Sequence, residues 1–130
     1  MKRQAGFSLI EVLAAVLILT VVILTTIAVF TERQNRLRTA NETVLTYQAL
    51  ANEAEVRRRD PFAQLETQPP AFVTDTSLLR PLGPFTTAVT VVAKSAVRKD
   101  VTLSIRWGNG KRSAALVLIR TDAGGGANLW

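Results

Sequence analysis

The chain has 130 residues, which is the length of one small domain, and 48% of them are apolar. It carries 16 Lys and Arg against 10 Asp and Glu, a net charge of +6, and it has no His and no Cys. This composition excludes a disulfide framework and a thiolate site, and it removes the commonest zinc ligand and general base. Most enzyme classes are therefore disfavoured, no metal or cofactor is expected, and the charge alone does not indicate a nucleic-acid partner.

The first predicted element is an apolar helix over residues 7–30, which follows a short basic segment at residues 1–6. Of its 24 residues 19 are apolar, and as a helix it would extend roughly 36 Å, enough to cross a hydrocarbon core of about 30 Å. A secretory signal peptide has a similar basic start, but its apolar region is about 7 to 15 residues long and ends at a small-x-small cleavage site. The segment therefore favours an uncleaved transmembrane helix over a signal peptide.

Residues 31–60 are expected to continue this helix as an amphipathic one, because no Pro or Gly occurs between Phe7 and Asp60. Asp60 precedes Pro61, which favours a helix end at that point. Apolar residues at spacings of three and four predict one stripe of the helix, formed by Leu37, Ala40, Val44, Tyr47, Ala51 and Ala54. Three i,i+4 ion pairs predict a solvated outer face: Glu32 with Arg36, Glu53 with Arg57, and Glu55 with Arg59.

Residues 61–84 hold all five prolines and predict an irregular, partly packed loop. Residues 85–121 predict an antiparallel sheet, with strands at 85–93, 100–107 and 111–120. Asn109 and Gly110 favour a two-residue type I′ turn, which would place Ile105 opposite Ala114, Leu103 opposite Leu116, and Val101 opposite Leu118. The expected fold class is therefore α+β, a long N-terminal helix packed on a small three-stranded antiparallel sheet.

The segment 122–130 contains three consecutive glycines, at positions 124–126. A phosphate-binding loop would need a preceding strand, a following helix and a nearby Lys, and these do not fit in the remaining residues. We therefore expect a flexible tail, in which Trp130 either packs back on the domain or contacts a neighbour.

Glu11 is an acid inside the apolar segment, where a charge near a helix centre costs about 3 kcal/mol. Three interpretations compete. The segment could begin later, which would leave Glu11 at the membrane interface, or Glu11 could relay protons or ions, or it could pair with a positive charge from another chain. A relay needs further polar partners, and the apolar segment offers three threonines, so pairing between chains is the stronger interpretation.

The segment Gly6-Phe7-Ser8-Leu9-Ile10-Glu11-Val12 follows a short Lys/Arg leader and precedes the long apolar run. It resembles the class III signal of type IV pilins and type II secretion pseudopilins, which combines a Gly at the cleavage point, a Phe after it, a Glu further on and a long apolar helix. The likeness covers about the first 30 residues directly, and the helix, loop and sheet behind them are similar to the rest of the pilin architecture.

The resemblance implies that prepilin peptidase cuts between Gly6 and Phe7, removes the leader at residues 1–6 and methylates the new amine of Phe7. It also implies a single-pass protein of the bacterial inner membrane, with its C-terminal domain in the periplasm, whose helix later packs in a filament. Its partners would be the peptidase and methyltransferase, an inner-membrane assembly platform, the lipid bilayer, and other major and minor pilin or pseudopilin subunits. Glu11 would pair with the methylated amine of Phe7 on an adjacent subunit and so set the register of assembly.

Within this family the absence of Cys and a mature length of 130 minus 6, or 124, residues resemble a minor pilin or minor pseudopilin. The stretches EVLAAVLIL, ALANEAEVRR and VTLSIRWGNGKRSAALVLIRT are similar to minor pilins of the V type and to the I-type pseudopilin, two groups that resemble each other. The proline found midway in many pilin helices is absent here. The predicted function is a minor pilin-like subunit that assembles into or primes a type IV pilus, with a minor pseudopilin as the alternative.

A remote alternative is a pilus-displayed subunit that binds DNA through Arg57, Arg58 and Arg59. The simpler interpretation is that these cations complement the dipole at a helix C-terminus and stay solvated. An enzyme is the remotest class, because the carboxylates have no metal-ligand spacing and no Ser or Lys has an activating base.

Overall fold

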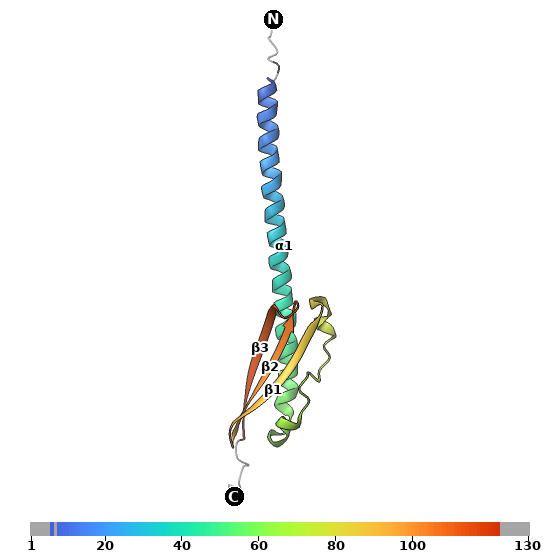
Figure 1. The fold of residues 1–130 in the computed structure, drawn as a ribbon, viewed down its shortest axis with the longest axis vertical. Helices are drawn as coiled ribbons and strands as arrows, with labels where there is room; N and C mark the ends of the chain where they lie inside the picture. Colours follow the sequence, from blue (N-terminus) through green and yellow to red (C-terminus); the bar gives the residue numbers. More distant parts are fainter. Residues whose placement is uncertain (1–5, 7, 123–130) are drawn as a thin grey trace. The chain divides into compact units, whose positions relative to one another are not determined.

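The computed structural model describes residue 6 and residues 8–122, and its elements follow one another in a simple order (Figure 1). Helix α1 spans Leu9–Arg59, and the 3₁₀ helices η1 and η2 span Phe62–Thr67 and Ser77–Leu82. Strands β1, β2 and β3 span Phe85–Ser95, Arg98–Trp107 and Arg112–Thr121. The chain divides into two compact units, Met1–Ala40 and Asn41–Trp130. The leader residues 1–5, the predicted methylation site Phe7 and the tail residues 123–130 lie outside the described part.

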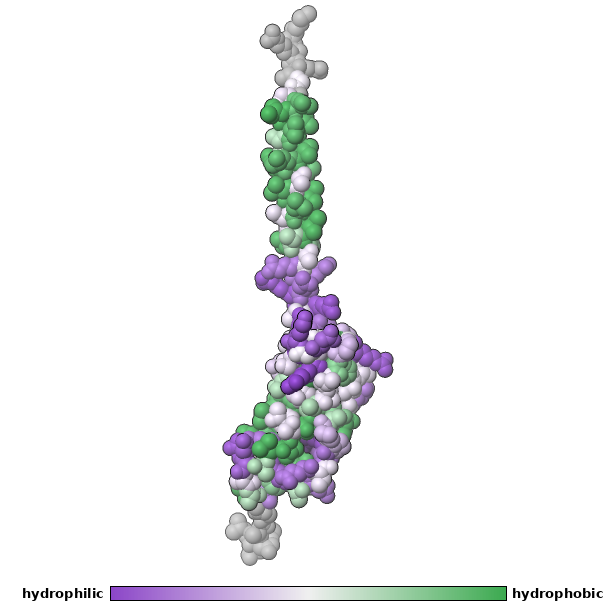
Figure 2. Space-filling view, viewed as in Figure 1, coloured by the Kyte–Doolittle hydropathy of each residue, from purple (hydrophilic) through white to green (hydrophobic). Residues whose placement is uncertain are grey.

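The first unit contains the apolar part of α1, whose side chains are exposed along their whole length. One helix within the described residues is long and apolar enough to cross a membrane, with a mean hydropathy of 2.9 over its most apolar window. Figure 2 shows this segment as an almost continuous hydrophobic surface that ends in a band of hydrophilic residues. The unit therefore has no core of its own to bury its apolar side chains, as expected for a helix that uses a bilayer or other helices as its surroundings.

The second unit is built on a three-stranded antiparallel sheet in the order β1-β2-β3. The register predicted for the second hairpin is confirmed: Val101 pairs with Leu118, Leu103 with Leu116 and Ile105 with Ala114. Asn109 and Gly110 have φ angles of 57° and 80°, and the Lys111 N–H donates to the Gly108 carbonyl over 3.2 Å. Positive φ at both central residues is what a type I′ turn requires. The first hairpin is tighter than predicted, so β1 and β2 extend to residues 95 and 98.

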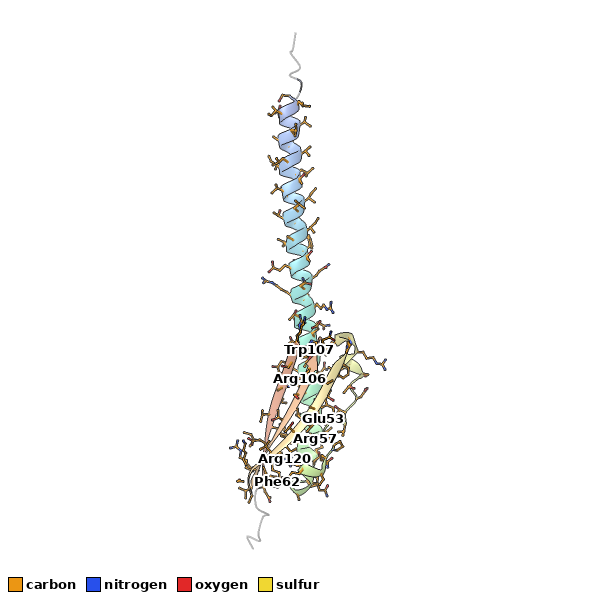
Figure 3. All side chains as sticks on the ribbon, viewed as in Figure 1. Glu53, Arg57, Phe62, Arg106, Trp107 and Arg120 are labelled. Atoms are coloured by element: carbon orange, nitrogen blue, oxygen red, sulfur yellow. The ribbon has the colours of Figure 1, made fainter. Side chains whose placement is uncertain are left out.

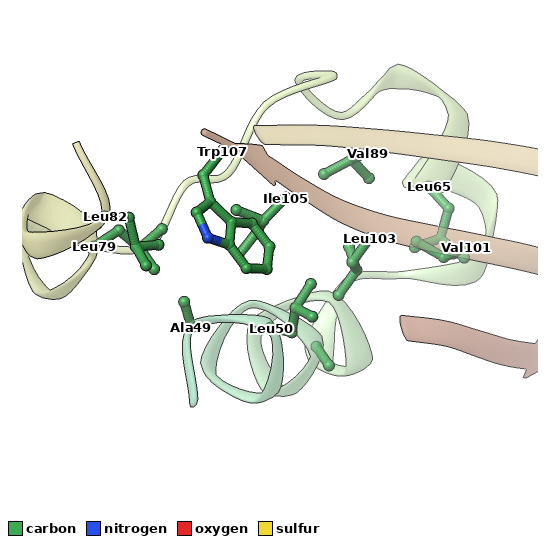
Figure 4. Packing of buried hydrophobic residues seen from close by; sticks show 11 residues of the cluster. Ala49, Leu50, Leu65, Leu79, Leu82, Val89, Val101, Leu103, Ile105 and Trp107 are labelled. Atoms are coloured by element: carbon green, nitrogen blue, oxygen red, sulfur yellow. The ribbon is translucent and has the colours of Figure 1, made fainter. Parts of the chain in front are cut away.

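The core lies between one face of this sheet and residues 49–54 of α1 (Figure 4). Leu103 and Ile105 of β2 and Leu50 of α1 are fully buried, and Trp107 closes one end beside η2. The proline-rich segment contributes to the same core through Leu65, Leu79 and Leu82. The predicted loop at 61–84 is thus partly packed, as expected, but it also forms two 3₁₀ helices that carry these leucines inward.

The buried face of α1 differs from the predicted apolar stripe. Leu37, Val44 and Tyr47 are more than half exposed, whereas Ala54 alone of that stripe belongs to the core. The helix residues that are buried are Glu42, Thr46, Ala49, Leu50, Glu53, Ala54 and Arg57. Hydrophobic periodicity failed here because four of these seven positions carry polar side chains, each of which finds a hydrogen-bond partner. The pair Glu53 and Arg57, predicted on a solvated face, is inside the domain.

Candidate assembly site

The charge of Glu11 lies in the first turn of α1. Its backbone N–H donates to the Ser8 hydroxyl over 3.3 Å and to the Ser8 carbonyl over 3.0 Å, so Ser8 caps the helix. A Ser three residues before a Glu is the pattern of a capping box, a signal present in the sequence that our prediction did not use. A carboxylate in the first turn also interacts favourably with the positive end of the helix dipole. The helix terminus therefore offsets part of the cost of this charge without a second chain.

An apolar hollow of about 570 Å³ runs along the same face of α1 as Glu11. It is lined by Glu11, Val12, Ala15, Val16 and Leu19. These positions share one face at helical spacing, and the small Ala15 side chain near their middle leaves room for a close neighbour. The carboxylate thus lies at one end of an exposed apolar face of the helix.

The other polar groups of the apolar segment are satisfied by the helix itself. The hydroxyls of Thr20, Thr25 and Thr26 donate to backbone carbonyls three or four residues earlier, over 2.7–3.0 Å. None of these bonds involves Glu11, so the described residues contain no chain of hydrogen bonds from its carboxylate to the threonines.

Gly6 lies just before this helix, and its backbone imposes no requirement for glycine. A Cβ at this position would meet no atom within 4 Å. Within the described residues, the space around position 6 therefore does not require a glycine. The neighbouring Phe7 lies outside the described residues.

A second polar cluster lies inside the second unit, where Glu53 and Arg57 of α1 bind segment 69–74 (Figure 3). The Arg57 Nε donates to Glu53 Oε1 over 2.8 Å, and both side chains are essentially fully buried. The Glu53 carboxylate also accepts the Val73 N–H over 3.1 Å, the Thr74 N–H over 3.0 Å and the Thr74 hydroxyl over 2.9 Å. These bonds hold the loop against the helix.

Arg57 also binds the loop, through the carbonyls of residues that precede Val73. Its Nη2 donates to the carbonyls of Pro69 and Ala71 over 3.2 and 2.9 Å. Its Nη1 is buried without a hydrogen bond and lies 3.8 Å from a carboxylate oxygen of Asp60. The Arg57 guanidinium is therefore occupied by contacts inside the second unit.

Burial and hydrogen bonding act in opposite directions on the pKa of Glu53. Burial raises the pKa, but the hydrogen bonds from Thr74, Val73 and Arg57 together outweigh it and lower the pKa below its ordinary value. Glu53 is therefore held in its charged form at neutral pH. Its role is structural, because its oxygens are occupied by donors from its own chain.

These positions correct the polyanion site predicted at the end of α1. Arg57 is 1% exposed, so it cannot contact a polyanion, nor does it stay solvated as the simpler interpretation expected. Arg58 and Arg59 are exposed, and both lie within 4 Å of the Glu55 carboxylate. The three arginines do not form one exposed patch.

Comparison with known families identifies the N-terminal segment. Residues 1–27 match the family described as the prokaryotic N-terminal methylation motif. No curated protein and no solved structure matches the chain. With the long apolar helix that follows, the match fits the class III signal of pilins and pseudopilins, which confirms the resemblance drawn from the sequence.

Proposed function

We propose that this chain is a minor pilin-like structural subunit that prepilin peptidase cleaves between Gly6 and Phe7 and N-methylates, and that it assembles into or primes a type IV pilus. The methylation motif supports the broader class, a type IV pilin-like or pseudopilin-like subunit. The finer assignment to a minor pilin rests on the absence of Cys and on the length of the chain. A minor pseudopilin of a type II secretion system is the alternative.

The observation that carries the proposal is that Glu11, a charged residue, lies on an apolar face of the helix. The carboxylate lies at one end of the hollow that passes Ala15 and Leu19, a surface that fits a neighbouring helix. A positive charge on that neighbour would attract the carboxylate strongly in an apolar environment, where either charge alone is penalised. The methylated amine of Phe7 on an adjacent subunit would supply that charge, and so Glu11 would fix the register of assembly.

The proposed location follows from the same segment. The apolar helix anchors the subunit in the bacterial inner membrane, with the sheet domain in the periplasm, until an inner-membrane assembly platform moves it into a filament. Its partners are then prepilin peptidase, the platform, the bilayer and other pilin or pseudopilin subunits. The role is structural, not enzymatic.

The proposal is tested by replacing Glu11 in cells that carry the native assembly system. We expect Glu11→Gln and Glu11→Ala to be processed and inserted in the membrane but incorporated poorly into filaments. Mass spectrometry of the purified protein reports removal of residues 1–6 and methylation, and immunoblots of sheared filaments report incorporation. Ser8→Ala is the matched control, since it removes the helix cap and keeps the carboxylate.

Normal incorporation of Glu11→Gln would contradict the assembly role, because this variant keeps the size of the side chain and loses its charge. An equal defect in Ser8→Ala would assign the effect to the helix terminus. An unprocessed wild-type chain would contradict the family assignment itself. Identification of the subunits that co-purify with the chain from the membrane would distinguish a type IV pilus from a type II secretion system.

A further inference from the structure

The three strands carry six cationic side chains, and partners inside the second unit bind four of them. Arg98 pairs with Asp100, Lys99 with Glu66, and Arg112 with Glu42, while Arg120 donates to carbonyls at the end of α1. Within residues 6 and 8–122, Arg106 and Lys94 have no hydrogen bond or ion pair through their side chains. Arg106 is therefore a free guanidinium in a sheet whose other arginines are engaged.

Arg106 lies on the sheet face opposite the core. It is paired across the strands with Thr86 of β1 and Ser113 of β3, and it is exposed, whereas its neighbours Ile105 and Trp107 point inward. Figure 3 places Arg106 and Trp107 at the same end of β2. Helix α1 covers the inner face through Leu50, whereas Thr86, Arg106 and Ser113 on the outer face are exposed.

Two hollows of about 350 and 340 Å³ meet at Arg106, and both are lined by Thr86 and Arg106. One extends toward Pro84, Phe85, Asn109 and Gly110, and the other toward Thr87, Ala88, Thr90 and Ser104. Each volume is at the lower end of the range for small-ligand sites. The two linings therefore combine one unpaired guanidinium with hydroxyl-bearing residues, one amide, and the apolar residues Pro84, Phe85 and Ala88.

This set of groups fits a ligand with one anionic group and many hydroxyls. A guanidinium binds a carboxylate through two parallel hydrogen bonds, and it keeps its charge at every physiological pH. Thr and Ser hydroxyls both donate and accept, and the Asn109 amide does the same, which matches the hydroxyls of a sugar ring. We propose that this surface binds an acidic saccharide, with Arg106 holding the carboxylate of a uronic acid and the surrounding hydroxyls binding its sugar.

Nucleic acid fits the surface less well. Recognition of a phosphate backbone uses several cations along a track, and these hollows are lined by one. Single strands also stack their bases on exposed aromatic rings, and the aromatic residue that lines the hollows, Phe85, is half-buried.

The test measures binding of a fluorescently labelled oligogalacturonate to the full chain in detergent micelles at low salt. We expect Arg106→Gln to weaken binding by at least about tenfold, and Arg106→Lys to have an intermediate effect because it keeps the charge and loses the two-pronged geometry. Lys94→Gln is the matched control, since it removes an equal charge from the same sheet. Labelled neutral dextran should not bind, and near-UV circular dichroism checks that each variant is folded.

Unchanged binding by Arg106→Gln would overturn the proposal, and so would an equal loss in Lys94→Gln, which would mean that net charge alone attracts the ligand. Tighter binding of a DNA duplex with the same dependence on Arg106 would also overturn it, in favour of a nucleic-acid surface. Because the measurement uses unassembled protein, its failure has no bearing on the role of Glu11 in assembly.

Discussion

At the scale of single residues, the second unit depends on buried polar side chains that are held by hydrogen bonds and ion pairs. Glu53 accepts hydrogen bonds from Arg57 and from the loop at Val73 and Thr74, so it joins helix and loop through one carboxylate. Removing one partner of a buried ion pair leaves the other charge without compensation, which costs about 3–5 kcal/mol. An exposed pair such as Glu55 with Arg59 contributes about 0–1 kcal/mol at most.

This carboxylate predicts how the stability of the domain depends on pH. The folded state lowers the pKa of Glu53 below its ordinary 4.5. Its contribution is therefore complete above pH 4.5, and it is lost as the pH falls through the lower pKa of the folded state. In thermal unfolding of the full chain in detergent, we expect Tm to fall with acidification below this value, and the fall to be smaller in Glu53→Gln, which is also less stable at pH 7.

Glu55→Gln serves as the matched control on the same helix, because its side chain is exposed and we expect it to keep the acid sensitivity of the wild type. Asp75 contributes in the same direction, since hydrogen bonds from Ser77 lower its pKa, so some sensitivity should remain in Glu53→Gln. A Glu53→Gln variant with the full acid sensitivity of the wild type would contradict the assignment.

At the scale of elements, the hairpin of β2 and β3 is set by the chemistry of its turn. Gly108, Asn109 and Gly110 all have positive φ, and the apolar pairs that follow from this register face the core. A left-handed backbone costs a residue with a Cβ about 1–2 kcal/mol, and Asn tolerates it better than most residues.

We therefore predict that Gly110→Ala destabilises the domain by about 1–2 kcal/mol. Its φ is 80°, and a Cβ at this position would meet no atom within 4 Å, so the loss would come from backbone conformation and not from a clash. Asn109→Gly, which relaxes the same turn, should be close to neutral. Urea unfolding of the full chain in detergent measures both changes, and equal effects of the two substitutions would argue against a conformational origin.

The elements of the fold differ in how far the sequence predicts them. The hairpin was predictable because two local signals, the Asn-Gly turn and the alternation of β2, required the same register. The buried face of α1 was not, because Glu42, Glu53 and Arg57 occupy it while Val44 and Tyr47 are exposed. Apart from the pair that Glu53 and Arg57 form with each other, the hydrogen bonds of these side chains reach segments 12 to 70 residues away, so no window along the helix shows that this face is buried. Glu11 could be recognised because it broke a local pattern.

At the scale of the whole molecule, one helix serves two environments. Within the first unit, residues 9–30 of α1 expose an apolar surface with one acid, Glu11, and in the second unit the helix packs against a sheet. The same helix geometry is stabilised by different surroundings: tertiary contacts in the second unit and, in the proposed function, lipid and then neighbouring helices in the first. A substitution on α1 should therefore affect membrane anchoring or domain folding according to the unit in which it lies.

This division predicts opposite outcomes for the same substitution at two exposed positions. Ile18→Lys places a charge near the middle of the apolar segment, where insertion scales assign a cost of about 2.5–3.5 kcal/mol, whereas Val44→Lys lies on the exposed face of the second unit. We expect the Ile18 variant to lose most of its resistance to extraction from membranes by alkaline carbonate, and the Val44 variant to keep it. Equal retention of both variants would contradict a membrane-spanning role for the segment, and equal loss would mean that any added charge on α1 disturbs insertion.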